Sequence, residues 1–139
     1  MLNGQTFDLS YPAVMGIVTL TPDSFSDGGD LMILENALEA CRERVDCGAS
    51  IIDIGGESTR PGSFFVSIEE ELRRIMPVIE ALPKDEFLIS VDTNKIEVQE
   101  AVLKAGAHII NDIMGGTPEL FALAEEYQAG LVLMHTSAS

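Results

Sequence analysis

The chain has 139 residues, of which 46% are hydrophobic and 22% charged, a composition typical of one globular domain with a hydrophobic core. Its formal net charge of -15 at pH 7 repels nucleic acid and anionic membranes, so we expect neither as a partner. The apolar runs are too short to cross a bilayer, and we expect no signal peptide. Cys41 and Cys47 lack metal-ligand spacing, which indicates reduced thiols in a cytoplasmic protein.

Residues 1–12 predict a short hairpin, because Asn3-Gly4 is a favoured turn pair and Phe7 and Leu9 alternate with polar neighbours. From residue 13 to 139 the pattern predicts alternating strands and helices of a single domain. Apolar runs of strand length occur at 14–20, 50–54, 87–91, 108–112 and 130–135, and helical spacing occurs at 32–47, 67–81, 95–105 and 118–127. Near-continuous apolar strands are typical of a parallel sheet covered by helices.

The helix expected at 67–81 has the clearest local signals. One face carries four apolar residues at helical spacing: Leu72, Ile75, Met76 and Ile79. Ser67 with Glu70 three residues later predicts a capping box at its start. The tripeptides at 47–49 and 105–107 predict glycine C-caps that end the first and third helices.

Strict alternation of strands and helices leaves two architectures, a doubly wound sheet or a (β/α)₈ barrel. No G-x-G-x-x-G follows the first strand, which argues against a dinucleotide-binding sheet. A whole barrel needs about 250 residues, so this chain would supply little more than half of one.

Polar, glycine-bearing stretches follow the first four predicted strands. They read "TPDSFSDGG" at 21–29, "DIGGESTRPG" at 53–62, "SVDTNK" at 90–95 and "INDIMGG" at 110–116. The loops at the opposite end, "CGAS" and "AGAH", are short and carry no comparable cluster of polar residues. Because ligands bind at the carboxyl ends of the strands in either architecture, one end of the sheet is predicted to be the site.

Two side chains at these strand ends are candidates for binding a heterocycle. Asp92 follows a buried strand, where a carboxylate needs a partner. Its carboxylate could accept hydrogen bonds from the ring N–H and amino groups of a heterocycle. Alternatively, Asp92 or Thr93 could cap the next helix. Asn111 has both a donor and an acceptor and could form hydrogen bonds with the same ring edge. Alternatively, its side chain could form a hydrogen bond with the loop backbone. Asp53 and Asp112 are expected to be structural partners.

The stretch "GGESTRPG" is a candidate for anion binding. Its glycines let backbone N–H groups approach an anion, and Ser58 and Thr59 offer hydroxyl donors. Arg60 suits a phosphate or carboxylate, although the same loop could be an ordinary entry turn to a helix. His108 is expected to be a structural residue at the start of a strand.

Together these stretches resemble the dihydropteroate synthase family. The blocks "MGIVTLTPDSFSDGG", "GASIIDIGGESTRPG", "SVDTNK" and "GAHIINDI" occur in that family's order and spacing. The resemblance implies about half of a TIM barrel, five parallel strands and four helices. It implies a Mg²⁺-dependent transferase of folate biosynthesis, the target of sulfonamides. Such an enzyme joins p-aminobenzoate to 7,8-dihydropterin-6-methyl diphosphate and releases pyrophosphate.

The resemblance also implies roles for individual residues. Asp92 and Asn111 would hold the pterin, and Asp92 and Arg60 would be the catalytic residues. Four further residues would contact substrate: Phe25 in the p-aminobenzoate pocket, Ser58 and Thr59 on the second loop, and Ile113 as an apolar wall. Thr19 stands where the family usually has an asparagine that ligates Mg²⁺, and a threonine hydroxyl is a poorer ligand.

Family members continue for several more β/α units, which would carry an aspartate, a lysine and an Arg-x-His group. We therefore expect a truncated chain, one part of a split gene, or a chain complemented by a carboxyl-terminal half. Unpaired strand edges also favour self-association into a homo-oligomer.

Two alternatives remain at this point. One is the pterin-binding domain of corrinoid methyltransferases, a similar barrel that binds methyltetrahydrofolate. The other is a non-catalytic half-barrel that binds a pterin, or only a partner chain.

If Thr19 weakens Mg²⁺ binding, then Thr19→Asn should tighten magnesium-dependent binding of pyrophosphate, because a carboxamide oxygen is the better ligand. Calorimetric titration of pyrophosphate with and without Mg²⁺ measures this. Equal affinities of the two proteins would contradict the expectation.

Overall fold

The computed structural model describes residues 14–20, 30–56, 67–112 and 115–133, so the hairpin expected at 1–12 lies outside the described residues. Strands and helices alternate in these ranges: β1 (Met15–Thr19), α1 (Asp30–Asp46), β2 (Ile51–Gly55), α2 (Ile68–Ala81), β3 (Leu88–Asp92), α3 (Ile96–Lys104), β4 (Ile109–Asp112), α4 (Pro118–Tyr127) and β5 (Gly130–Leu133). The prediction of five strands and four helices is confirmed, with most boundaries shifted by one or two residues.

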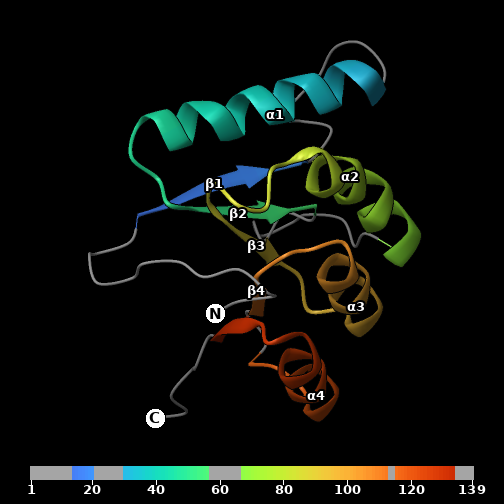
Figure 1. Cartoon of the computed structure of the whole chain (residues 1–139). Helices are drawn as coiled ribbons and strands as arrows, with labels where there is room; N and C mark the ends of the chain where they lie inside the picture. The colour runs from blue at the N-terminus through green and yellow to red at the C-terminus, as the bar shows by residue number, and fades with distance from the viewer. Residues whose placement is uncertain (1–13, 21–29, 57–66, 113–114, 134–139) are drawn as a thin grey trace, which may run out of the picture.

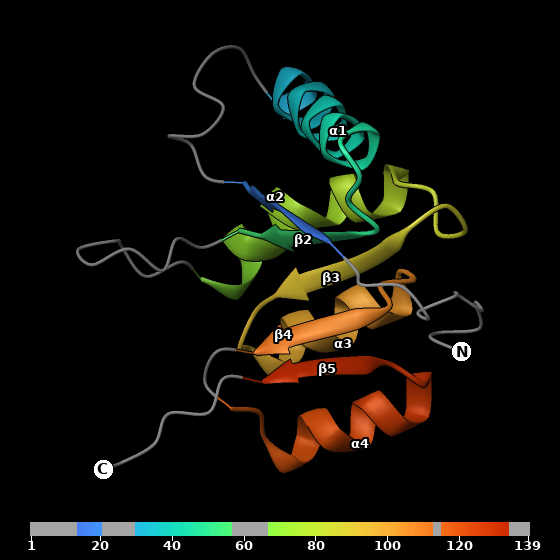
Figure 2. The same ribbon diagram turned by 90° about the vertical axis from the view of Figure 1, so that its left-hand side faces the viewer.

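All five strands are parallel and follow one another in the sheet in chain order, β1-β2-β3-β4-β5. Figure 2 shows their arrows pointing the same way. A doubly wound sheet reverses its strand order at a switch point, and this order does not reverse. All four helices lie on one side of the sheet (Figure 1), and consecutive helices contact one another. This is the arrangement of consecutive units in a (β/α)₈ barrel.

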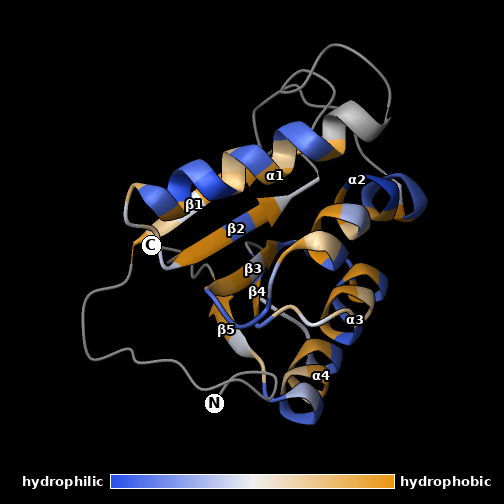
Figure 3. Ribbon diagram, turned by 45° about the horizontal axis from the view of Figure 1, so that its top comes forward, coloured by the Kyte–Doolittle hydropathy of each residue, from blue (hydrophilic) through white to orange (hydrophobic). Residues whose placement is uncertain are grey.

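The core lies between the sheet and the helices. The strand residues that face the helices are fully buried: Ile52, Ile54, Ile89, Val91 and Ile110. The predicted apolar face of α2 meets them, with Ile75 and Ile79 fully buried and Leu72 and Met76 packed at the margin. Each fully buried side chain of this size contributes about 1.5–3 kcal/mol. Hydrophobic strands and a hydrophilic outer face of α1 are visible in Figure 3.

The predicted helix signals are largely confirmed. The Ser67 side chain accepts from the Glu70 N–H at 3.2 Å, which is the first half of the expected capping box. The Glu70 carboxylate is bound by Arg73 and Arg74, so the second half is replaced by ion pairs. Gly48 and Gly106 have φ of 111° and 110° and form the expected C-caps of α1 and α3.

His108 is structural, as expected for a residue that leads into a strand. Its ring is fully buried, and Nδ1 accepts from the Ile89 N–H at 2.9 Å. Nε2 lies 3.0 Å from the Lys84 carbonyl oxygen and therefore carries the proton. Burial lowers the pKa of His108, and the Lys84 carbonyl acts in the opposite direction. The neutral ring thus ties β4 to β3 and to the preceding loop.

The buried His108 should make the fold acid-sensitive. Its pKa is lower when folded than when unfolded, so below about pH 6.5 the unfolded chain binds a proton that the folded chain does not. The free energy of unfolding should fall as pH falls through this range, by up to about 1.4 kcal/mol per pH unit. Urea denaturation at pH 7.5, 6.5 and 5.5 measures the slope. His108→Gln should be less stable but have a shallower slope, and parallel slopes would contradict the assignment.

Candidate functional site

The carboxyl ends of the first four strands bring the candidate residues into one row. Thr19 pairs with Gly55, Gly55 with Asp92, and Asp92 with Asn111. Paired residues of neighbouring parallel strands point to the same face, and strands lie about 4.8 Å apart. Since Ile54 and Val91 face the helices, this row faces the opposite side, which is the inner face of a barrel. The predicted clustering of Asp92 and Asn111 is confirmed.

Gly55 leaves space beside the Asp92 carboxylate. A Cβ added at Gly55 would lie 3.5 Å from Cβ of Asp92 and 4.0 Å from its Oδ2. Any side chain there would occupy the position between Thr19 and Asp92. The row therefore carries no side chain at Gly55, next to the Asp92 acceptor, an arrangement that suits the edge of a flat ring.

Asp92 itself is half-buried at the end of β3. The alternative that Asp92 or Thr93 is the N-cap of the next helix is wrong. Helix α3 has Lys95 as N-cap, without a side-chain capping bond. The Thr93 hydroxyl accepts from the Lys95 N–H at 3.3 Å, within the turn before the helix. Neither Asp92 nor Thr93 therefore occupies the N-cap position of α3.

Asn111 is held by a side chain rather than by loop backbone. Its Nδ2 donates to Oδ1 of Asp53 at 3.4 Å, and the Ser90 hydroxyl donates to the same oxygen at 2.7 Å. Asp53 and Ser90 are almost completely buried. Burial raises the pKa of Asp53, and the bonds from Ser90 and Asn111 act in the opposite direction. The expectation that Asp53 is a structural partner is confirmed.

A second polar group lies behind the row, on the helix side of the sheet. Gln99 of α3 donates through Nε2 to the Thr93 carbonyl at 2.9 Å and to the Asp112 carboxylate at 3.1 Å. Gln99 and Asp112 are fully buried. Asp112 is therefore the structural partner that the sequence predicted. The group joins the backbone after Asp92 to the residue after Asn111, so it fixes the two strand ends relative to each other.

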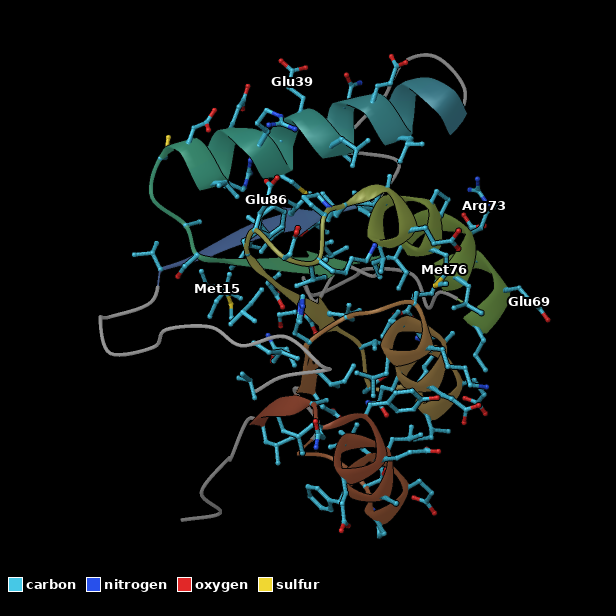
Figure 4. The ribbon with its side chains drawn as sticks, in the orientation of Figure 1. Met15, Glu39, Glu69, Arg73, Met76 and Glu86 are labelled. Carbon is cyan, nitrogen blue, oxygen red and sulfur yellow. The ribbon has the colours of Figure 1, made fainter. Side chains whose placement is uncertain are left out.

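The basic side chains of α2 and the β3–α3 turn are paired on the helix side. Lys95 Nζ lies 2.8 Å from Oε1 of the fully buried Glu71. Arg74 donates to the Gly56 carbonyl at 2.7 Å and pairs with Glu70. The Arg73 bond, followed by the Arg74 bond, lowers the pKa of Glu70 to about 2. Figure 4 shows Arg73 pointing away from the sheet, so its guanidinium group lies away from the site row.

Five predicted site residues lie outside the described residues: Phe25, Ser58, Thr59, Arg60 and Ile113. Their roles stay predictions. Thr19 is half-buried at the end of β1 and offers one neutral hydroxyl. Mg²⁺ prefers carboxylates and phosphate oxygens. Among the described residues no three His, Cys, Asp or Glu side chains are grouped as a metal site. These residues alone do not form a magnesium site.

Sequence reasoning missed the Glu71–Lys95 pair. A signal was present, because Glu71 precedes Ile75 by four residues and Val78 by seven, on the buried face of α2. A carboxylate at a buried helical position needs a partner. The partner itself, 24 residues away, follows only from the packing of α2 on α3.

Comparison with known proteins finds a matching family and similar sequences. A profile of the family "Pterin binding enzyme" matches residues 15–139. Dihydropteroate synthase of Escherichia coli (strain K12) is 51% identical over 134 residues, covering 95% of this chain and 48% of that protein. The synthase of Streptococcus pyogenes serotype M1 is 50% identical over 126 residues, covering 88% of this chain and 47% of that protein.

Solved structures of dihydropteroate synthases are also similar to this chain in fold and in sequence. Dihydropteroate synthase of Xanthomonas albilineans with 4-aminobenzoic acid has a TM-score of 0.86 and 45% identity, covering 99% of this chain and 52% of that one. The same enzyme in complex with 7,8-dihydropteroate has a TM-score of 0.80 and 42% identity, covering 99% and 51%. The chain thus spans about half the length of the relatives it matches.

The buried Glu71–Lys95 pair should behave differently from an exposed pair. Lys95→Met leaves the Glu71 carboxylate buried without its cation, and should cost about 3–5 kcal/mol of stability. The double variant Glu71→Leu/Lys95→Met removes both charges and should recover most of this loss. Urea denaturation measures both.

Lys104→Met is the matched control, because Lys104 pairs with Glu100 at 3.0 Å with both side chains exposed. Its urea denaturation midpoint should stay close to that of the wild type, because an exposed ion pair contributes little to stability. A double variant no more stable than Lys95→Met would contradict the assignment.

Proposed function

The chain belongs to the family of pterin-binding enzymes, and we propose that it forms the pterin-binding part of a dihydropteroate synthase active site, a transferase of folate biosynthesis. The observation that carries this proposal is the row of paired residues in which Asp92 and Asn111 stand side by side and Gly55 leaves the neighbouring position open. A carboxylate, an amide and a neighbouring position without a side chain together suit the polar edge of a flat heterocycle.

The proposed substrates are p-aminobenzoate and 7,8-dihydropterin-6-methyl diphosphate. Relatives with similar folds have been solved with 4-aminobenzoic acid and with 7,8-dihydropteroate, which supports this choice. In the reaction the C–O bond between the pterin methylene carbon and the diphosphate breaks. The aniline nitrogen of p-aminobenzoate then bonds to that carbon and loses a proton, and pyrophosphate leaves.

Within this reaction we assign Asp92 an electrostatic role. Loss of pyrophosphate leaves positive charge on the methylene carbon and the pterin ring. A fixed carboxylate that accepts a ring N–H stabilises this charge more than it stabilises the neutral ring. Asn111 contributes both hydrogen-bond types and so orients the ring. Arg60, which lies outside the described residues, is proposed to meet the negative charge of the diphosphate.

Magnesium stays part of the proposal. Mg²⁺ would neutralise the leaving pyrophosphate when bound. Of the described residues, Thr19 would supply at most one neutral oxygen ligand to the metal.

Two alternatives are less well supported. The relatives compared above are dihydropteroate synthases, which disfavours a corrinoid methyltransferase domain. A non-catalytic half-barrel would share the pterin row but release no pyrophosphate. Single-turnover assays with Mg²⁺ and both substrates distinguish these functions.

We also propose association with a second chain, either a further copy or a complementing carboxyl-terminal half. Support comes from apolar side chains exposed at both edges of the sheet, with Ile17 of β1 60% exposed and Val132 of β5 42% exposed. As far as the chain is described, none of its helices combines the length and hydrophobicity needed to span a bilayer. A cytoplasmic location is proposed from the two unpaired thiols.

Asp92→Ala should weaken binding of 6-hydroxymethylpterin by between about 10- and 150-fold, because a charged acceptor is lost from the ring edge. Calorimetric titration of the wild-type chain and the variant measures this. Asp85→Ala, an aspartate exposed in the loop before β3, is the matched control and should bind like the wild type. If the folded wild-type chain binds no pterin, or Asp92→Ala binds equally well, the proposed function is wrong.

A further inference from the structure

A buried aspartate next to the site row, Asp53, bonds side chains of both strands that carry the candidate site residues. Asp53 pairs in register with Ser90, and the two lie two residues before Gly55 and Asp92 on their strands. The Asp53 side chain therefore faces the same inner side. It is 3% exposed. Burying a carboxylate is costly unless donors satisfy it. Its two donors come from β3 and β4, the two strands that carry Asp92 and Asn111.

The bond to Asn111 determines which way round the amide sits. An ionised carboxylate only accepts hydrogen bonds, so the Asn111 group that faces Asp53 is the NH₂ end. The opposite orientation would place two oxygens against each other. Asn111 therefore keeps Oδ1 and one N–H for a ligand, in a fixed arrangement.

Ser90 contributes to the same arrangement. Its hydroxyl donates to Oδ1 of Asp53 at 2.7 Å and is fully buried. Because Oδ1 accepts from both Ser90 and Asn111, the Asp53 carboxylate is itself held in one orientation. The 2.7 Å bond from Ser90 and the longer 3.4 Å bond from Asn111 connect β2, β3 and β4 next to Gly55.

From this geometry we propose that Asp53 is a positioning residue, which acts through Asn111 and sets the donor and acceptor pattern that the site presents to a pterin. The inference rests on the proposed function. A ring edge has fixed donors and acceptors, so a reversed amide would leave groups on both partners unpaired. Asp53 thus contributes to ligand selectivity without touching the ligand.

The test uses Asp53→Asn, which keeps the size of the side chain but supplies both a donor and an acceptor. Asn111 can then adopt either orientation, and the affinity for 6-hydroxymethylpterin should fall about tenfold. In the Asn111→Ala background the same change should alter affinity less than about twofold, because the residue through which Asp53 acts is absent. Equal effects in both backgrounds would overturn the proposal.

Asp112→Asn is the matched control. Asp112 is an equally buried aspartate of β4, next to Asn111 but on the helix side, where it accepts from Gln99. Asp112→Asn should lower stability, and any change in pterin affinity should be the same within about twofold in the wild-type and Asn111→Ala backgrounds, because Asp112 does not bond the Asn111 amide. A loss for Asp112→Asn that disappears in the Asn111→Ala background, as expected for Asp53→Asn, would show that any buried charge change acts through Asn111, and would overturn the specific role of Asp53.

A second measurement does not need a bound ligand. In ¹⁵N–¹H spectra of the folded chain, one Asn111 side-chain N–H should exchange slowly with solvent, and Asp53→Asn should increase that rate while Asp112→Asn should not. If the wild-type chain binds no pterin, the proposed function fails, and this measurement still decides the role of Asp53. Equal exchange in wild type and Asp53→Asn would overturn it.

Discussion

The parallel register of β1 to β4 is the constraint on which the rest of the site depends. Because the pairing Thr19–Gly55–Asp92–Asn111 is continuous, residues from four separate chain segments meet in one row on one face. A shift of one residue in any strand would turn its site residue toward the helices. The apolar residues between them, such as Ile54 and Val91, resist that shift because they would lose their burial. Core packing and site geometry are therefore fixed by the same pairing.

The polar groups that the fold buries around this row are all satisfied within the described part of the chain, where no buried side-chain nitrogen or oxygen lacks a partner. They divide by face. Asp53 and Ser90 lie on the inner face beneath the site, whereas Gln99 and Asp112 lie between the sheet and α3. Each group connects neighbouring strand ends, so the row is supported from both sides.

The sequence predicted the elements well where local signals decide them. Helix α4 begins and ends at the expected residues, because Thr117 accepts from the Leu120 N–H and Pro118 occupies the first turn. The end of the same helix shows the limit. Gln128 adopts a left-handed conformation, φ 53°, that normally calls for glycine and costs about 1 kcal/mol in other residues. Tertiary packing determines the backbone conformation at such positions, and no local sequence pattern predicts it.

Two candidate site residues were also predictable from local sequence signals. Asp92 and Asn111 stood out because each is a polar residue at the end of an apolar run, and both lie where expected. Their partners were not predictable. The bond from Asn111 to Asp53 joins residues 58 apart in sequence, and the pair of Lys95 with Glu71 requires the helix packing. Pairings of this kind arise only once register and helix contacts are fixed.

Charge is distributed in a way that would orient a ligand. The inner face carries the carboxylates Asp53 and Asp92, while Lys95 and Arg74 are paired toward the helix layer. A pterin ring that becomes positively charged is favoured at such a floor, and a diphosphate is repelled by it. If the ligand is a pterin diphosphate, the ring must face the sheet and the diphosphate must lie away from it. In the proposed reaction, the same acidic floor would hold the ring and direct the leaving group outward, so binding orientation and transition-state stabilisation would follow from one set of side chains.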